Sequence, residues 1–305
     1  MSATITGERA DAASIRRRAG APVGRTASMR TRERRRTVSL GIIAWVIGLI
    51  FFGPIVWMLL TSLHSETTAA TNPPNLFAPL TLSSYANFFG ASSGASPWPP
   101  LINSVSMSLG STAIVLILSI PAAYALAIRP VRKWSDVMFF FLTTKMLPMV
   151  AGLLPVYLIA KQLGLLDTVG LMVIIYTSMN LPIAVWMMRS FFAEIPLEVI
   201  EAAQVDGAGL LLTFRRIIIP LASPGIIATA LICFIFSWNE LLFASVLTST
   251  TSYTAPVFLT SFVTSEGLFL SKVCAASIAI SLPVLAAGFA AQDKLVQGLS
   301  LGAIK

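Results

Sequence analysis

Long runs of apolar residues alternate with shorter polar segments along this chain of 305 residues. A helix needs roughly 20 apolar residues to cross a hydrocarbon core about 30 Å thick. Six runs reach or approach that length, at 38–63, 103–128, 137–160, 169–188, 221–247 and 273–291. The pattern therefore predicts an all-α integral membrane protein with six transmembrane helices.

The composition agrees with this interpretation. Hydrophobic residues make up 56% of the chain, above the roughly 45 to 50% of soluble domains, and the mean hydropathy is +0.82. Charged residues contribute only 11%. A soluble globular domain is therefore not expected.

The distribution of basic residues predicts the orientation, because Lys and Arg near span ends are retained on the cytoplasmic side. With the N-terminus inside, 18 of the 21 Lys and Arg residues fall in cytoplasmic segments. The two long external loops, 64–100 and 248–270, contain none. Both termini are therefore expected to be cytoplasmic.

Three regions follow from the pattern. Residues 1–36 hold ten arginines and no apolar run, so we expect a disordered basic cytoplasmic tail. Retention of positive charge accounts for these arginines without nucleic-acid binding. Residues 37–298 form the six-span domain, and 299–305 form a cytoplasmic C-terminal tail.

The chain shows no recognisable catalytic or metal-binding pattern. Cys233 and Cys274 fall within predicted spans and form no C-x-x-C pair, and His64 is the sole histidine. The sequence also lacks a G-x-x-x-x-G-K-[ST] phosphate loop, H-E-x-x-H and G-x-S-x-G. We expect no catalytic residue and no metal site, so energy for any transport must come from a partner or an ion gradient.

A cluster of acids interrupts the apolar pattern in the segment 194–220, between the fourth and fifth spans. Glu198, Glu201 and Asp206 lie within EVIEAAQVDGAG, and a short helix is predicted from Pro196 to Val205. Pro suits the first turn of a helix, and an acid near the helix start favours its dipole. This helix is too short to cross a membrane.

The small residues beside these acids favour contact with a partner. Ala202 and Ala203 permit close approach by another surface, and Glu201 can pair with a partner's arginine. Gly207 allows the chain to turn after the helix. The alternative is an amphipathic linker lying on the bilayer surface.

The segment EAAQVDGAG followed by FRRIIIPLASPG resembles the EAA motif of permease subunits in binding-protein-dependent ABC importers. SWNELLFA and the closing VQGLSLGAIK are similar to the second, maltose-type permease subunit of carbohydrate importers. The resemblance implies that the short helix is a coupling helix that docks into an ATPase subunit. The ATPase-coupling residues it implies are Glu198, Glu201, Ala202, Ala203, Asp206 and Gly207.

The same resemblance implies the partners and location. They are a second, homologous permease subunit in a heterodimer, two ATPase subunits, an extracytoplasmic solute-binding protein and the lipids of a bacterial cell membrane. ATP and Mg would be bound by the ATPase subunits, so this chain would bind no cofactor. It implies a permease for a sugar or sugar alcohol. An importer for peptides or phosphate is the alternative, and a secondary transporter is less favoured because a single ionisable residue lies near a midplane.

Three polar residues in predicted spans are candidates for the pathway or its gating. Lys145 lies about 13 Å into the third span at 1.5 Å per residue. A cation at that depth costs about 2.5 to 3.5 kcal/mol, so it faces either a water-filled pathway or an anionic partner. Asn239 and Glu240 lie near the outer boundary, where an interfacial or interhelical hydrogen-bonding role is the other interpretation. Pro148 is one of the prolines at which a kink is expected.

Overall fold

The computed structural model describes residues 27–71, 75, 77–90, 96–128, 131–264 and 267–301. The predicted tail segments 1–26 and 302–305 lie outside these residues. The chain divides into two compact units, Met1–Met58 and Leu59–Lys305, and each is considered by itself.

The described part of the first unit belongs to one helix, α2 (Ala27–Ser62), whose segment Arg36–Ser62 is long and apolar enough to cross a membrane. The sequence predicted a disordered tail up to residue 36, but α2 already starts at Ala27. Residues 27–36 are thus helical rather than disordered. The reason is that Ala, Met, Arg and Glu favour helix, and extending an existing helix requires no new nucleus.

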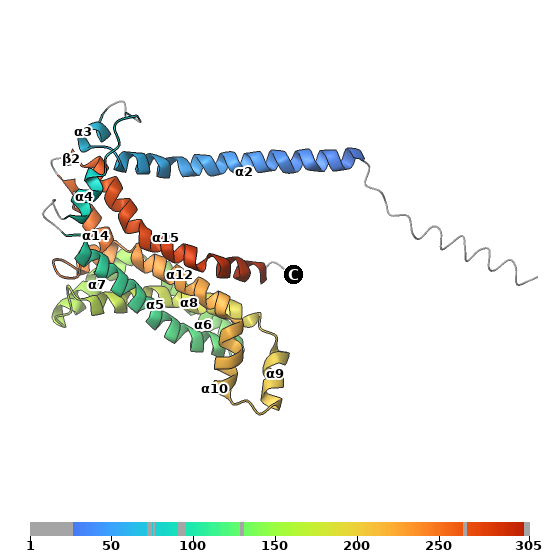
Figure 1. Cartoon of the computed structure of the whole chain (residues 1–305). Coiled ribbons are helices and arrows are strands. Elements are labelled where there is room, and N and C mark those ends of the chain that lie inside the picture. The colour runs from blue at the N-terminus through green and yellow to red at the C-terminus, as the bar shows by residue number, and fades with distance from the viewer. Residues whose placement is uncertain are drawn as a thin grey trace, which may run out of the picture. The chain divides into compact units, whose positions relative to one another are not determined.

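Four helices form the packed bundle of the second unit. They are α5 (Trp98–Ala127), α8 (Val169–Ala193), α12 (Ser223–Trp238) and α15 (Leu270–Leu301). Helix α5 packs against α8 and α12, and α12 also packs against α8 and α15 (Figure 1). The bundle encloses fully buried side chains such as Met107, Val115 and Tyr176.

Small polar side chains connect the bundle helices. Ser111 Oγ on α5 lies 3.0 Å from Ser237 Oγ on α12. The Asn180 amide on α8 donates to Ser237 Oγ over 2.9 Å and to the carbonyl of Tyr176 over 2.9 Å. Such contacts suit a membrane interior, where unpaired polar groups are costly and small residues let helices approach closely.

Shorter elements complete the second unit. Two helices after α5 are α6 (Trp134–Met146) and α7 (Met149–Gln162). The loops between helices contain α3 (Glu66–Ala69), α4 (Ser83–Phe89), α13 (Leu242–Leu247), α14 (Ala255–Thr260) and an antiparallel pair of two-residue strands, β1 (Val263–Thr264) and β2 (Gly267–Leu268).

The remaining elements lie between α8 and α12. They are α9 (Leu197–Val205), α10 (Leu210–Thr213), the π-helical turn η1 (Phe214–Ile218) and α11 (Ile219–Leu221). Figure 1 shows α9 and α10 side by side beyond one end of the bundle, and the two helices are in contact.

Two of the predicted spans are not continuous helices. The predicted span 137–160 consists of α6 and α7, which meet at an angle of 86°. The predicted span 221–247 ends as a helix at Trp238, because Asn239 and Glu240 leave helical geometry before α13. The helical run Leu210–Leu221 meets α12 at 72°. Among the described residues, four helices are long enough to span, and the number is six when each bent pair counts as one.

Candidate functional site

Local signals in the sequence account for helix α9. Pro196 occupies the N-cap position with an extended backbone, and Glu198 lies in the first turn, where it favours the helix dipole. The helix observed, Leu197–Val205, begins one residue after the predicted start and ends at the predicted residue. A stable nine-residue helix also needs packing, because isolated helices shorter than about 12 residues are marginal in water.

One face of α9 is exposed. Glu198, Glu201, Ala202 and Val205 are all exposed, and Val205 is 88% exposed. Their spacing of three, four and seven residues places them on one side of the helix. Among the described residues, no Lys or Arg lies within 4.0 Å of either carboxylate. We call these four residues the acidic face of α9.

Ala203 does not belong to the acidic face. It is buried within this chain, as is Ile200, which packs in a cluster that includes Phe192 and Ile218. The predicted use of Ala203 for close approach by another protein is therefore corrected: its methyl group faces the chain's own fold. Val205, which the prediction omitted, is identifiable by its position four residues after Glu201.

A tight turn ends α9 and sets its direction. The N–H of Asp206 donates to the carbonyl of Ala202 over 3.0 Å, and the N–H of Ala208 donates to that of Ala203 over 2.9 Å. Gly207 has φ +79°, a conformation that residues with a side chain rarely adopt. Empty space surrounds the point where a Cβ would stand, so the backbone and not crowding requires glycine. Asp206 is exposed.

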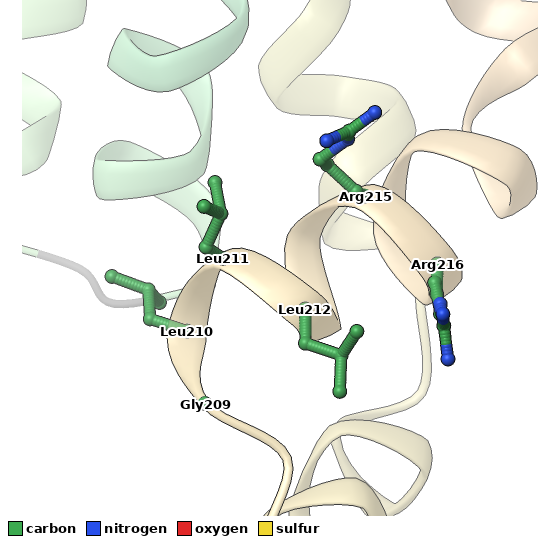
Figure 2. Close-up of a pocket in the computed structure, with 6 residues that line it drawn as sticks. All are labelled: Gly209, Leu210, Leu211, Leu212, Arg215 and Arg216. Carbon is green, nitrogen blue, oxygen red and sulfur yellow. The ribbon is translucent and has the colours of Figure 1, made fainter.

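A groove of about 700 Å³ follows this turn. Figure 2 shows its lining, which comes from one short helical stretch: Gly209, Leu210, Leu211, Leu212, Arg215 and Arg216. All six residues are exposed. The π-helical geometry of η1 begins within this stretch, and such turns are rare and frequent at functional sites.

The break between α6 and α7 opens a second cavity, of about 410 Å³. Its lining includes Lys145 and Thr144 from α6, Pro148 at the break, Ser178 from α8 and Phe243 from α13. Lys145 is exposed, and no carboxylate of the described residues lies within 4.0 Å of its ammonium. The described part of the chain thus offers Lys145 a cavity and no ion pair.

Asn239 and Glu240 have hydrogen bonds within their own segment. The exposed Asn239 amide donates to the carbonyl of Ile235 over 2.8 Å. The buried Glu240 carboxylate accepts from the N–H groups of Phe243 over 2.9 Å and Ala244 over 3.1 Å, which caps the start of α13. These bonds are local to residues 235–244 and do not test the interfacial or interhelical role expected from the sequence.

Asp167 forms a clamp that the sequence prediction missed. Its carboxylate accepts from the backbone N–H groups of all four residues 249–252, at 2.9 to 3.1 Å, and from the hydroxyls of Ser249 and Ser252, each at 2.9 Å. Burial acts to raise the pKa of this carboxyl, but the hydrogen bonds outweigh it and hold the pKa well below its usual range. The clamp joins the loop before α8 to the loop after α13.

The comparison with known families decides the identity. Residues 116–299 match the family described as binding-protein-dependent transport system inner membrane component. The chain belongs to this family.

Curated relatives of this permease are similar to it in sequence along most of its length. The probable ABC transporter permease protein y4oR of Sinorhizobium fredii is 36% identical over 85% of this chain and 92% of its own. The trehalose transport system permease protein SugB of Mycobacterium tuberculosis is 32% identical over 83% of this chain and 92% of its own. A solved bacterial ABC transporter involved in the import of the acidic polysaccharide alginate matches with a TM-score of 0.68 and 25% identity, over 90% of this chain and 100% of that chain.

The family defines the class of this permease. It is a multi-pass inner-membrane component of a transport system, a class that generally lacks enzymatic activity and works with separate ATPase subunits. The family match includes both α9 and the groove residues of Figure 2.

Proposed function

We propose that this permease forms half of the translocation pathway of an ATP-driven carbohydrate importer, for a sugar or a sugar alcohol. Its partners in this proposal are a second, homologous permease, two ATPase subunits that bind ATP and Mg, and an extracytoplasmic solute-binding protein. The trehalose relative and the alginate transporter support carbohydrate as the solute class. Six spans and cytoplasmic termini belong to the same proposal and rest on the bent helix pairs and the basic residues.

The observation that carries the proposal is the acidic face of α9. A nine-residue helix projects between two spanning segments, shows two carboxylates without a basic partner in the described chain, and ends in a glycine turn. An exposed, unpaired anionic face suits a charge-assisted contact with a basic group on another protein. In this proposal, α9 docks into the ATPase subunit, and ATP-driven movement of that subunit is transmitted to the attached spans.

Lys145 and the cavity at the α6–α7 break are proposed to line the pathway. The cavity relieves the cost of a cation within the membrane, and the polar residues Thr144 and Ser178 belong to the same lining. Lys145→Met should lower transport several-fold while leaving the assembled complex intact. Loss of assembly at normal expression would instead identify Lys145 as half of an ion pair with a partner subunit, because breaking such a pair costs about 3 to 5 kcal/mol.

The proposed function is tested with the assembled complex in liposomes. We expect ATP-dependent uptake of the ligand that co-purifies with the solute-binding protein, and we expect that ligand to be a carbohydrate. A peptide or phosphate as the ligand would contradict the solute class. Uptake by this chain alone, without ATPase subunits, would contradict the permease assignment itself.

A further inference from the structure

The groove after the Gly207 turn combines exposed apolar and basic groups. The proposed coupling role of α9 does not explain this combination. Leu210 and Leu211 are 61% and 70% exposed. Arg215 and Arg216 are also exposed, and Figure 2 shows Arg215 on the side of Leu211 and Arg216 on the side of Leu212. Among the described residues, no carboxylate lies within 4.0 Å of either guanidinium. Exposed leucines and unpaired arginines in one groove are complementary to a ligand with an apolar part and an anionic part.

The orientation of the helical run Leu210–Leu221 places this groove at the edge of the membrane. The run meets α12 at 72°, so it lies close to the membrane plane when α12 crosses the bilayer. Helix α12 has 16 residues, about 24 Å at 1.5 Å per residue, which is shorter than a hydrocarbon core of about 30 Å. The run directly precedes α12, so it lies along the boundary between lipid tails and headgroups when α12 enters the bilayer at its first residue.

The order of side chains along this run matches that boundary. Leu211 and Arg215 are four residues apart, as are Leu212 and Arg216, so each arginine lies on the turn next to a leucine (Figure 2). A leucine can contact acyl chains while the guanidinium reaches phosphate oxygens, for which its planar donors are well suited.

We infer that the groove formed by Gly209, Leu210, Leu211, Leu212, Arg215 and Arg216 binds the headgroup and upper acyl chains of an anionic phospholipid. Charge complementarity selects an anionic lipid over a zwitterionic one, and the leucines select a lipid over free phosphate. Assignment to the cytoplasmic leaflet, where anionic lipids attract basic segments, rests on the orientation proposed above. The bound lipid would hold the base of the α9 loop against the membrane.

The test uses the complete transporter, purified in mild detergent, with native mass spectrometry to count retained phosphatidylglycerol. The double variant Arg215→Gln/Arg216→Gln should bind phosphatidylglycerol on the order of tenfold more weakly than the wild type. Arg132→Gln/Lys133→Gln is the matched control, because it removes the same charge from exposed residues between α5 and α6. The control should retain lipid as the wild type does.

Two further variants keep the test decisive if the double variant assembles poorly. Arg215→Lys/Arg216→Lys keeps the charge and should retain most of the lipid, whereas Leu211→Gln should lower retention several-fold with both arginines present. Glycerol phosphate in solution should not displace the lipid.

Four results would overturn the inference. The first is lipid retention in Arg215→Gln/Arg216→Gln equal to that of the wild type, and the second is a loss of lipid in Arg132→Gln/Lys133→Gln as large as in that variant. The third is displacement of the lipid by glycerol phosphate, which would indicate a site for free phosphate. The fourth is loss of the ATPase subunit from Arg215→Gln/Arg216→Gln with lipid retention unchanged. The last result would assign the groove to a protein contact.

Discussion

Asp167 lies in a loop and Glu201 in the middle of helix α9, and their carboxylates have opposite surroundings. Asp167 accepts hydrogen bonds from every backbone N–H group of residues 249–252, whereas Glu201 is exposed and has no basic group of the described chain within 4.0 Å. The first charge is satisfied within the chain and therefore stabilises it. The second is left unsatisfied, which makes it available to another subunit. The comparison separates an acid that holds the fold from an exposed acid that we propose serves an interface.

The largest effect expected from this comparison concerns the clamp. Asp167→Ala should destabilise the loop 249–252 by about 3 kcal/mol, because it removes several charge-assisted hydrogen bonds at once, and those to Ser252 are partly buried. Hydrogen exchange of the amides in this loop should accelerate by about two orders of magnitude. Asp136→Ala, which removes an exposed acid without these bonds, is the control. Unchanged exchange in Asp167→Ala would show that the clamp contributes nothing.

Gly207→Val should have the next largest effect, through the backbone. A β-branched residue at φ +79° costs about 1 to 2 kcal/mol and changes the angle at which α9 leaves the fold. We expect ATPase attachment and solute uptake to fall together while the chain still inserts into the membrane. Gly170→Val is the matched control, since Gly170 lies outside the α9 loop, has no positive φ and has open space around it. Equal effects of both variants would remove the special role of the Gly207 turn.

Glu201→Ala should have a smaller effect, and only on the assembly. Loss of one charge-assisted contact, at about 1.5 kcal/mol, should weaken ATPase binding roughly tenfold, with no change in the stability of the isolated chain. Glu194→Ala removes an equally exposed acid outside α9 and should bind the ATPase normally. Titration of the detergent-purified permease pair with ATPase subunits measures both. If Glu201→Ala instead lowered the stability of the isolated chain and left ATPase binding unchanged, Glu201 would stabilise the fold, as Asp167 does, and would not contact the ATPase.

The smallest effect is the response of the clamp to pH. The folded pKa of Asp167 is depressed, so its contribution is complete above the unfolded value of about 3.9 and is lost as the pH falls through the folded value. Because Asp167 is partly exposed, solvent screening limits this loss, which begins only as the pH falls below about 3.9. The amides of residues 249–252 should therefore be better protected from hydrogen exchange in the wild type than in Asp167→Asn at neutral pH. This difference should shrink only at acidic pH. Loss near neutral pH would contradict the assignment.

Sequence patterns predicted the features that depend on neighbouring residues. The bounds of α9 follow from Pro196 and from the glycine turn, and the turn at Gly207, which has φ +79°, was expected from the same local signal. The apolar runs at α5, α8 and α15 correspond to continuous helices. Neighbouring residues of a helix point in different directions, so helical periodicity places Ala202 and Ala203 on different faces of α9.

Features that depend on distant residues were not predictable in the same way. Asp167 bonds a loop more than 80 residues later, so no local pattern marks the clamp. A kink at Pro148 was expected, but the size of the 86° bend depends on how α7 packs against the α8 and α13 side of the bundle. The break after Trp238 is stabilised by the Glu240 cap on α13, and that geometry appears only in the folded chain.

The central claim, that the acidic face of α9 contacts an ATPase subunit, is tested most directly by cross-linking from two positions on this helix. In the assembled transporter, with Cys233 and Cys274 replaced by alanine, Val205→Cys and Ala203→Cys are each treated with a short thiol-to-amine cross-linker. The account predicts an ATPase adduct from Val205→Cys, which is on the exposed face, and none from Ala203→Cys, which faces the chain's own fold. No adduct from Val205→Cys, or equal adducts from both positions, would contradict it.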